Sequence, residues 1–203
     1  MWRGTARYCS KMEPMIALHT PLTDEICESL RSGDRVLLTG KIYTARDVAH
    51  QRILDAIRDG KPLPFSLPGE IIFYAGPTPA KPGAPIGSIG PTTSGRMDRF
   101  VPKLLELGLK GMIGKGKRAP EVREAICRFK GVYFGAVGGI AALMARCVQS
   151  AKWVAYEDLG PEGILCLDVV DLPLVVINDS HGGDLYEEAI CRYRRPSFLE
   201  DSD

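Results

Sequence analysis

The stretch EIIFYAG, residues 70–76, is an uninterrupted apolar run with the length and composition of a buried β-strand. It leads into PTPAKPGAPIGSIGPTTSG, residues 77–95, which is too rich in proline and glycine for regular structure. We expect a helix to resume near Ser94, and a second apolar strand, LKGMIG, follows at residues 109–114. This order of strand, helix and strand predicts a right-handed βαβ unit in a parallel sheet.

The same alternation extends outward from this unit. Downstream we predict a helix at residues 119–131 with Pro120 in its first turn, a strand at 132–137 and a small-residue helix at 138–149. Upstream we predict a helix with Thr23 as its N-cap, a strand at 35–40 and a helix at 47–60. The flanks contain more strands, including residues 151–159 and 163–180, so we expect an α/β fold with a second, antiparallel layer.

Length and charge limit the classes of function. A chain of 203 residues is long enough for one hydrophobic core, so we predict a single domain, at residues 15–192. We expect a disordered lead at residues 1–14 and a frayed tail at 193–203. The 26 basic and 25 acidic side chains give a net charge of +1, which provides no reason to expect nucleic acid or an anionic membrane as partner. The basic N-terminus has no following apolar stretch, so we expect no secretory signal and a cytoplasmic location.

The cysteines are scattered along the chain and form no C-x-x-C pair. They are Cys9, Cys27, Cys127, Cys147, Cys166 and Cys191. Without close spacing of ligands, we expect this chain to hold no complete metal or iron–sulfur site. Reduced structural thiols are the expectation.

The end of the long loop, GSIGPTTSGRMD at residues 87–98, has the composition of an anion cradle. We expect Thr92–Ser94 to lie at a helix N-terminus, where backbone N–H groups favour anions. Gly90 and Gly95 would let the backbone approach a ligand closely, and Arg96 can bind a carboxylate or phosphate with two N–H donors. The alternative is an ordinary N-cap beside a solvated arginine.

Two other turns carry cations. GMIGKGKR, residues 111–118, has the G-x-x-x-x-G-K spacing of a phosphate-binding loop, but Arg118 replaces the hydroxyl that holds magnesium. Lys115 in this turn either faces an anion or is solvated. Arg46 follows a strand and precedes a helix, where it either binds an anion or pairs with Asp47 on the surface.

The remaining polar residues are less informative. We expect His50 on the polar face of its helix and His181 in an exposed turn. Glu157 and Asp158 end a strand and are either site residues or structural caps.

Five motifs in order, IYTARDVAH, YAGPTPAKPG, GSIGPTTSGRMD, MIGKGKR and GAVGGIAALMA, are followed by YEDLGPEGI. Over about residues 15–190 the chain therefore resembles the beta subunit of the two-subunit, iron–sulfur class I fumarases and L(+)-tartrate dehydratases. This subunit is equivalent to the C-terminal domain of single-chain class I fumarases. Relatives often have Pro and Tyr where this chain has Arg99 and Phe100, a departure outside the core of the site.

The resemblance implies a swivelling three-layer β/β/α domain with a mainly parallel central sheet and a second antiparallel sheet. It implies reversible hydration of fumarate to L-malate with a [4Fe–4S] cluster held by the alpha subunit, so that this chain alone is inactive. Its pattern assigns Arg46, Thr92, Thr93, Arg96 and Lys115 to the dicarboxylate site, with Thr92, Thr93 and Arg96 catalytic. It also implies a heterotetramer or a higher dimer-based assembly. The identity of the catalytic base stays open between a threonine and an alpha-subunit carboxylate.

Three other functions stay open from the sequence. The chain could be the beta subunit of an L(+)-tartrate dehydratase, since both substrates are C4 dicarboxylates. It could be a free-standing module that binds an anion or nucleotide through the lysine turn, or a noncatalytic scaffold subunit.

Overall fold

The computed structural model describes residues 15–136, 139 and 141–194. The described residues form one seven-stranded sheet in the order β1-β2-β3-β4-β5-β7-β6. The strands are β1 Ile16–His19, β2 Arg35–Thr44, β3 Ile71–Phe73, β4 Gly111–Gly114, β5 Val132–Gly135, β6 Val148–Ala155 and β7 Ile164–Asn178. The α-helices are α1 Asp24–Ser29, α2 Asp47–Arg58, α3 Val101–Glu106, α4 Pro120–Phe129, α5 Ala141–Arg146 and α6 Leu185–Tyr193. Two 3₁₀ segments, η1 Ser94–Met97 and η2 Glu157–Glu162, complete the set.

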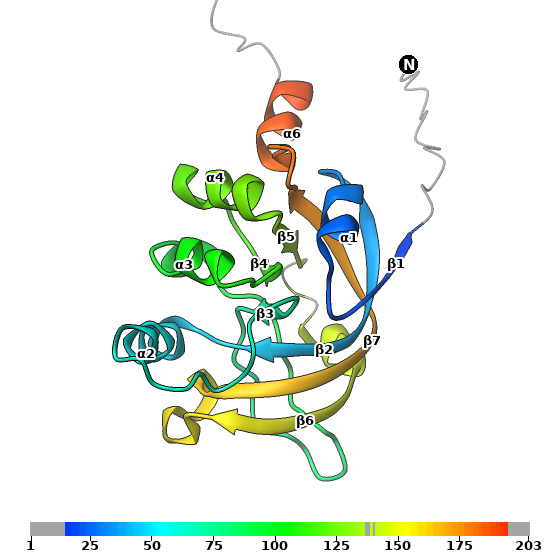
Figure 1. Cartoon of the computed structure of the whole chain (residues 1–203). Coiled ribbons are helices and arrows are strands. Elements are labelled where there is room, and N and C mark those ends of the chain that lie inside the picture. Colours follow the sequence, from blue (N-terminus) through cyan, green and yellow to red (C-terminus); the bar gives the residue numbers. More distant parts are fainter. Residues whose placement is uncertain (1–14, 137–138, 140, 195–203) are drawn as a thin grey trace, which may run out of the picture.

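The sheet combines parallel and antiparallel strands, which confirms the predicted mixed α/β class. Strands β1 to β5 pair in parallel, and β7 runs antiparallel to β2, β5 and β6. β2 pairs with β7 over most of its length, but its last residues, Tyr43 and Thr44, pair with β3. The hydrogen-bonded strands β2, β3, β4, β5 and β7 therefore close into a ring (Figure 1). The antiparallel strands belong to this same sheet, and the three-layer description stays a prediction.

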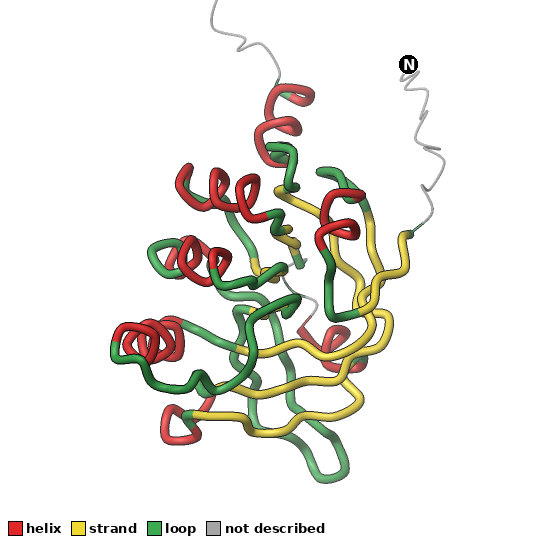
Figure 2. The backbone as a smooth tube through the Cα atoms, viewed as in Figure 1, coloured by secondary structure: helices red, strands yellow, loops and turns green. Residues whose placement is uncertain are grey.

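The helices cover the parallel strands because each has an apolar stripe. α2 buries Ala49 and Ile53, and α4 buries Val122, Ala125 and Ile126. Figures 1 and 2 show α2, α3 and α4 side by side on one flank of the strands. Each lies in the connection that follows a parallel strand, as a βαβ unit requires.

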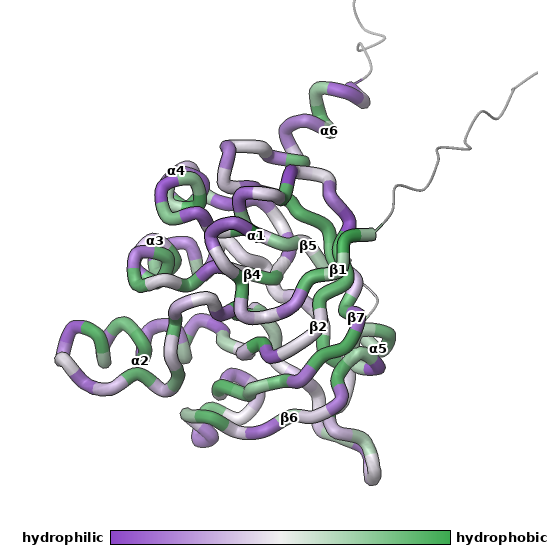
Figure 3. The backbone as a smooth tube through the Cα atoms, turned by 45° about the vertical axis from the view of Figure 1, so that its right-hand side comes forward, coloured by the Kyte–Doolittle hydropathy of each residue, from purple (hydrophilic) through white to green (hydrophobic). Residues whose placement is uncertain are grey.

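Two apolar clusters hold the fold together. One lies within the curled strands and includes Val36, Phe134 and Leu167. The other lies between the parallel strands and the helices, and includes Ile53 and Leu104. In Figure 3, β1, β2 and β7 are largely hydrophobic, whereas the exposed helices alternate between hydrophobic and hydrophilic residues.

Several predicted elements are confirmed and some differ. Thr23 is the N-cap of α1, and its hydroxyl accepts a hydrogen bond from the Ile26 amide at 3.3 Å. The strand expected at 35–40 continues to Thr44, while β1 and α6 have no counterpart among the predicted elements. The helix expected near Ser94 is the single 3₁₀ turn η1, and the α-helix begins at Val101. The lead and the end of the tail lie outside the described residues.

Candidate functional site

The candidate site residues lie where three neighbouring parallel strands end. Arg46 follows β2, and Lys115 directly follows β4. The Thr92 amide donates to the carbonyl of Tyr74, the residue after β3, at 2.7 Å. Thr93 forms a parallel bridge with Lys115. The carboxyl edge of β2, β3 and β4 therefore brings the long loop and the two cationic turns together, in the position where α/β sheets bind ligands.

Two backbone amides at the end of the loop are already paired, which corrects one expectation. The Thr92 amide is used by Tyr74, and the Ser94 amide donates to the Lys115 carbonyl at 2.9 Å. η1 has four residues, so it offers neither free amides at these positions nor the dipole of a long helix. A Cβ on Gly90 would lie 3.0 Å from Ala141 Cβ, so this glycine allows close packing on α5. The amides of Thr92 and Ser94 are therefore not available to an anion.

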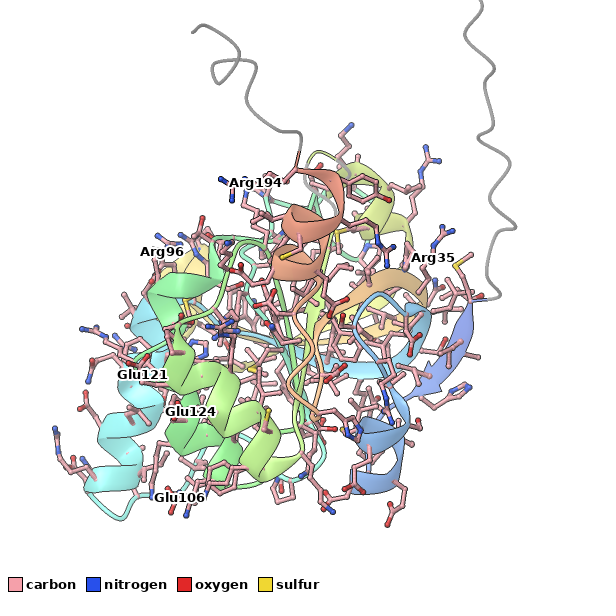
Figure 4. All side chains as sticks on the ribbon, turned by 90° about the horizontal axis from the view of Figure 1, so that it is seen from above. Arg35, Arg96, Glu106, Glu121, Glu124 and Arg194 are labelled. Carbon is pink, nitrogen blue, oxygen red and sulfur yellow. The ribbon has the colours of Figure 1, made fainter. Side chains whose placement is uncertain are left out.

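Arg96 joins the loop to the start of α2. Its Nη2 donates to Thr92 Oγ1 at 2.7 Å and lies 3.4 Å from Asp47 Oδ2. The Arg96 side chain is 47% exposed, and Figure 4 shows Arg96 at the edge of the molecule, far from Glu106 at the end of α3. The guanidinium is therefore oriented by two oxygens while it stays accessible to a ligand.

Arg46 is held at the first turn of α2, as its N-cap residue. Of the two alternatives, the surface pairing with Asp47 is not formed: Arg46 Nη2 pairs with Glu162 Oε1 at 3.1 Å, because η2 lies beside α2. Its side chain is 25% exposed, and its buried Nε has no hydrogen-bond partner among the described residues. Gly76 leaves room here, since a Cβ at this position would lie 3.3 Å from Arg46 Nη1.

Lys115 differs from the two arginines. It is exposed, and no described carboxylate forms a salt bridge with it. It borders a cavity of about 290 Å³ otherwise lined by Gly135, Ala136, Val175, Ile177, Leu185 and Tyr186. Gly111–Gly114, the start of the G-x-x-x-x-G-K spacing, is the buried strand β4. In a nucleotide-binding loop this segment would wrap around the phosphates. Its strand conformation therefore argues against nucleotide binding here.

A polar layer is buried beneath the loop. Arg118, whose side chain is fully buried, donates from Nε to Asp98 Oδ1 at 2.7 Å. Its guanidinium carbon lies 4.8 Å from the ring centroid of Tyr133 and 5.4 Å from that of Tyr74. The Tyr133 hydroxyl is 2.9 Å from both the Ser94 hydroxyl and the Gly116 carbonyl. Arg118 is thus a structural cation under the site.

His50 belongs to this buried side, which corrects the expectation of a polar-face residue. It is fully buried, and Nδ1 donates to the Arg46 carbonyl at 2.8 Å. Burial lowers the pKa of His50 to about 4, so the ring is neutral at pH 7. Nε2 has no hydrogen-bond partner among the described residues.

Asp158 and His181 contact residues other than the candidate site residues. Asp158 pairs with Arg52 through two bonds of 2.8 and 2.6 Å, and this pairing lowers the pKa of its carboxyl. His181 is exposed, as predicted, and its Nε2 lies 2.8 Å from the Glu28 carbonyl. Glu157 is the first residue of η2, directly before Asp158.

The described residues do not fit an iron–sulfur cluster. They contain no group of three or more His, Cys, Asp or Glu side chains that could hold a metal ion. The described cysteines are unpaired, and Cys9 lies outside the described range. In the part of the chain with assigned structure, no helix is long and apolar enough to cross a membrane.

Sequence reasoning missed the residues that hold the candidate site in place. Glu162 is distant in sequence from Arg46, and Tyr133 reads as an ordinary residue of an apolar strand. Ser94 was expected among the anion-facing residues, but it is fully buried. A buried tyrosine in a strand next to a glycine-rich turn would have been a signal, because its hydroxyl needs a partner.

The chain matches the family model described as "Fumarase C-terminus" over residues 4–189. It is 39% identical over 158 residues to the anaerobic class I fumarate hydratase of Escherichia coli, which covers 77% of this chain but 29% of that protein. It is 38% identical over 191 residues to the L(+)-tartrate dehydratase subunit beta of E. coli, covering 91% and 94% of the two chains. A putative L(+)-tartrate dehydratase subunit beta of Methanocaldococcus jannaschii is 40% identical over 173 residues, covering 82% and 89%. These matches confirm the resemblance found in the motifs.

Proposed function

The chain belongs to the fumarase C-terminus family, and from this premise we propose that it is the beta subunit of a two-subunit hydro-lyase. The proposed reaction is the reversible hydration of fumarate to L-malate. Two of the similar proteins carry the name subunit beta, which supports a partner alpha subunit, and the chain spans 29% of the length of the E. coli fumarate hydratase. In this proposal the domain has the three-layer swivelling architecture of the family and works in the cytoplasm, within a heterotetramer or a higher dimer-based assembly.

The observation that carries the proposal is the convergence of Arg46, Arg96 and Lys115 at the ends of β2, β3 and β4. A C4 dicarboxylate dianion needs a cation for each carboxylate, and guanidinium groups bind carboxylates with two donors. Arg46, Thr92, Thr93, Arg96 and Lys115 form the substrate-binding wall in this proposal. The exposed Lys115 and the half-exposed Arg96 are accessible to an incoming ligand.

Thr92, Thr93 and Arg96 are the proposed catalytic residues. When a hydroxy-dicarboxylate loses the proton on the carbon next to a carboxylate, negative charge accumulates on that carboxylate. A cation fixed in advance stabilises this charge, and Arg96 is oriented by Thr92 Oγ1 and Asp47. Because Thr92 Oγ1 accepts from the guanidinium, its own proton is left to donate to substrate. A threonine is a weak base unaided, so the choice between it and an alpha-subunit carboxylate stays open.

The proposed division of labour places the [4Fe–4S] cluster in the alpha subunit. When bound there, the cluster would supply a Lewis acid for the reaction. The described residues of this chain do not fit such a cluster, so its contribution is the cationic and hydroxyl wall.

L(+)-tartrate dehydration to oxaloacetate is the second candidate. It is favoured by the near-complete coverage between this chain and two proteins that carry the tartrate dehydratase name. Tartrate differs from malate by one hydroxyl, and Thr93 is an exposed hydroxyl that can hydrogen-bond to it.

The test is anaerobic co-expression with an alpha subunit, followed by assays on fumarate, malate and tartrate. We expect hydratase activity in the complex, and neither activity nor iron–sulfur absorbance from this chain alone. A cluster bound by the isolated chain would overturn the division of labour. A complex that turns over tartrate faster than malate would select the second candidate.

A further inference from the structure

Tyr133 is a buried residue of β5 whose hydroxyl bridges two turns. It lies 2.9 Å from the Gly116 carbonyl and 2.9 Å from Ser94 Oγ. A carbonyl can only accept, so the single Tyr133 proton is donated to Gly116. The Ser94 hydroxyl must then donate to Tyr133, which gives a directed chain from Ser94 through Tyr133 to Gly116.

The two ends of this chain are the immediate neighbours of site residues. Ser94 follows Thr93, and Gly116 follows Lys115. The same segments also meet through the Thr93–Lys115 bridge and through the Ser94 amide, which donates to the Lys115 carbonyl at 2.9 Å. The Tyr133 hydroxyl is thus a side-chain link from β5 across the junction that sets the separation of Thr93 and Lys115.

This junction leaves little room for adjustment. Ser94 is fully buried, and a Cβ on Gly114 would collide with the Ser94 hydroxyl. The Tyr133 ring is held from one side by Arg118, whose guanidinium carbon lies 4.8 Å from the ring centroid. Arg118 is itself fixed by Asp98 at 2.7 Å. The phenol therefore has a defined position before any ligand arrives.

The chemistry of Tyr133 fits positioning rather than proton transfer. Burial raises the pKa of its hydroxyl well above the ordinary value, although the Ser94 bond opposes the shift. Its one proton is committed to Gly116 and its oxygen accepts from Ser94. A buried neutral phenol with both functions satisfied has nothing to exchange with a substrate.

We propose that Tyr133 is a positioning residue: through Ser94 and Gly116 it fixes Lys115 relative to Thr93, and so sets how tightly the site holds one substrate carboxylate. This inference rests on the proposed function. Lys115 lacks a carboxylate partner among the described residues, so backbone placement of its turn substitutes for the side-chain contacts that orient Arg46 and Arg96.

The first measurement needs no activity. Amide hydrogen exchange of the full chain is compared for wild type, Tyr133→Phe and Ser94→Ala. The groups compared are the backbone amide of residue 94 and the amides of residues 115–117. We expect roughly three- to tenfold faster exchange of the Ser94 amide in both variants, in line with loss of one buried hydrogen bond. Tyr74→Phe is the matched control, because Tyr74 is equally buried, also stacks on Arg118, and has a hydroxyl without a hydrogen-bond partner among the described residues. Wild-type exchange in Tyr133→Phe would overturn the inference.

The second measurement uses the complex with the alpha subunit. Tyr133→Phe should raise KM for the dicarboxylate roughly three- to tenfold and change kcat less, because a misplaced Lys115 weakens binding. A purely structural role would lower the amount of active enzyme and leave KM unchanged, which would overturn the inference. With Lys115→Ala as background, Tyr133→Phe should have little further effect on KM, since both act on one contact. If the wild-type complex has no hydro-lyase activity, the proposed function fails, whatever the exchange data show.

Discussion

Two arginine–aspartate pairs in this chain have nearly the same shortest N···O distance and opposite surroundings. Arg118 meets Asp98 at 2.7 Å and Arg52 meets Asp158 at 2.6 Å. Both arginines also lie over a tyrosine ring, at 4.8 Å for Arg118 and 5.1 Å for Arg52. In the first pair the side chains are 0% and 12% exposed, and in the second 37% and 63%.

The difference teaches that burial, rather than bond length, decides what an ion pair does. Water screens the exposed pair, so either partner can be lost at little cost. The buried pair has no such screen, and loss of one partner leaves an unpaired charge in the interior. The buried pair also joins the end of the candidate loop to the turn before α4, because Asp98 Oδ2 accepts from the Ala119 amide at 2.7 Å. It therefore supports the site, whereas the exposed pair joins α2 to η2.

The largest expected effect is on stability, from Asp98→Ala. The substitution strands the buried Arg118 guanidinium, and we expect the free energy of unfolding to fall by about 3–5 kcal/mol. Urea denaturation followed by circular dichroism measures it. Asp98→Asn, which keeps one of the two acceptor oxygens used by Arg118 and the Ala119 amide, should fold with a smaller loss. The matched control Asp158→Ala should leave the midpoint unchanged, and equal losses in the two pairs would break the comparison.

The next effect is a pH dependence of stability that comes from His50. Its pKa is lowered to about 4 by burial, and Arg118 adds to the shift while the Arg46 carbonyl and Asp47 oppose it. Between pH 6.5 and 4 the unfolded chain therefore binds more protons than the folded chain, so stability is lost as the pH falls through this window. The loss should be about 3 kcal/mol.

Urea denaturation of wild type and His50→Gln at several pH values between 7.5 and 4.5 checks this expectation. His50→Gln should flatten the profile. Parallel profiles for wild type and His50→Gln would contradict the burial argument.

The third effect is on catalysis. It sharpens the comparison because an exposed arginine is expected to matter for activity while it contributes little to stability. Arg96→Ala in the complex should lower kcat/KM at least about 10²-fold, as for a lost partner of transition-state charge. Its stability should hardly change, since the side chain is 47% exposed. The control is Arg99→Ala, three residues along, whose side chain stacks on Phe100 at 4.4 Å. Steady-state kinetics equal to wild type in Arg96→Ala would remove Arg96 from the site.

The strand ends of the candidate site could be predicted because they depend on local patterns. Apolar runs ending in Arg46, in the long loop and in Lys115 place these residues at one edge of a parallel sheet. The sequence could not show that the Thr92 amide is paired with Tyr74 and the Ser94 amide with Lys115, because these bonds join segments far apart in the chain. For the same reason Glu162, the partner of Arg46, could not be found.

The mistake at His50 has a different physical cause. Helical periodicity assigns Val48 and Ile53 to the apolar face of α2, but Val48 is 43% exposed while Ala49 and His50 are buried. The first turn of α2 lies against Tyr74 and Phe100, whose rings pack on His50 at 5.4 and 5.7 Å between centroids. A histidine can be buried there because Nδ1 donates to the Arg46 carbonyl one helical turn earlier, so a local hydrogen bond and the packing of the two rings outweigh the polar-face preference.

The smallest effect concerns the intermediate case between the two ion pairs, Arg46 with Glu162, whose side chains are 25% and 28% exposed. Glu162→Gln keeps an acceptor for Arg46 but removes a negative charge near the dianion, so KM in the complex should fall about two- to threefold. Glu162→Ala also removes the orienting contact and should raise KM. Because the charge contribution is screened, 0.5 M salt should abolish the decrease in Glu162→Gln and spare the increase in Glu162→Ala. KM shifts of the same sign in both variants would mean that Glu162 acts on Arg46 through charge or orientation alone.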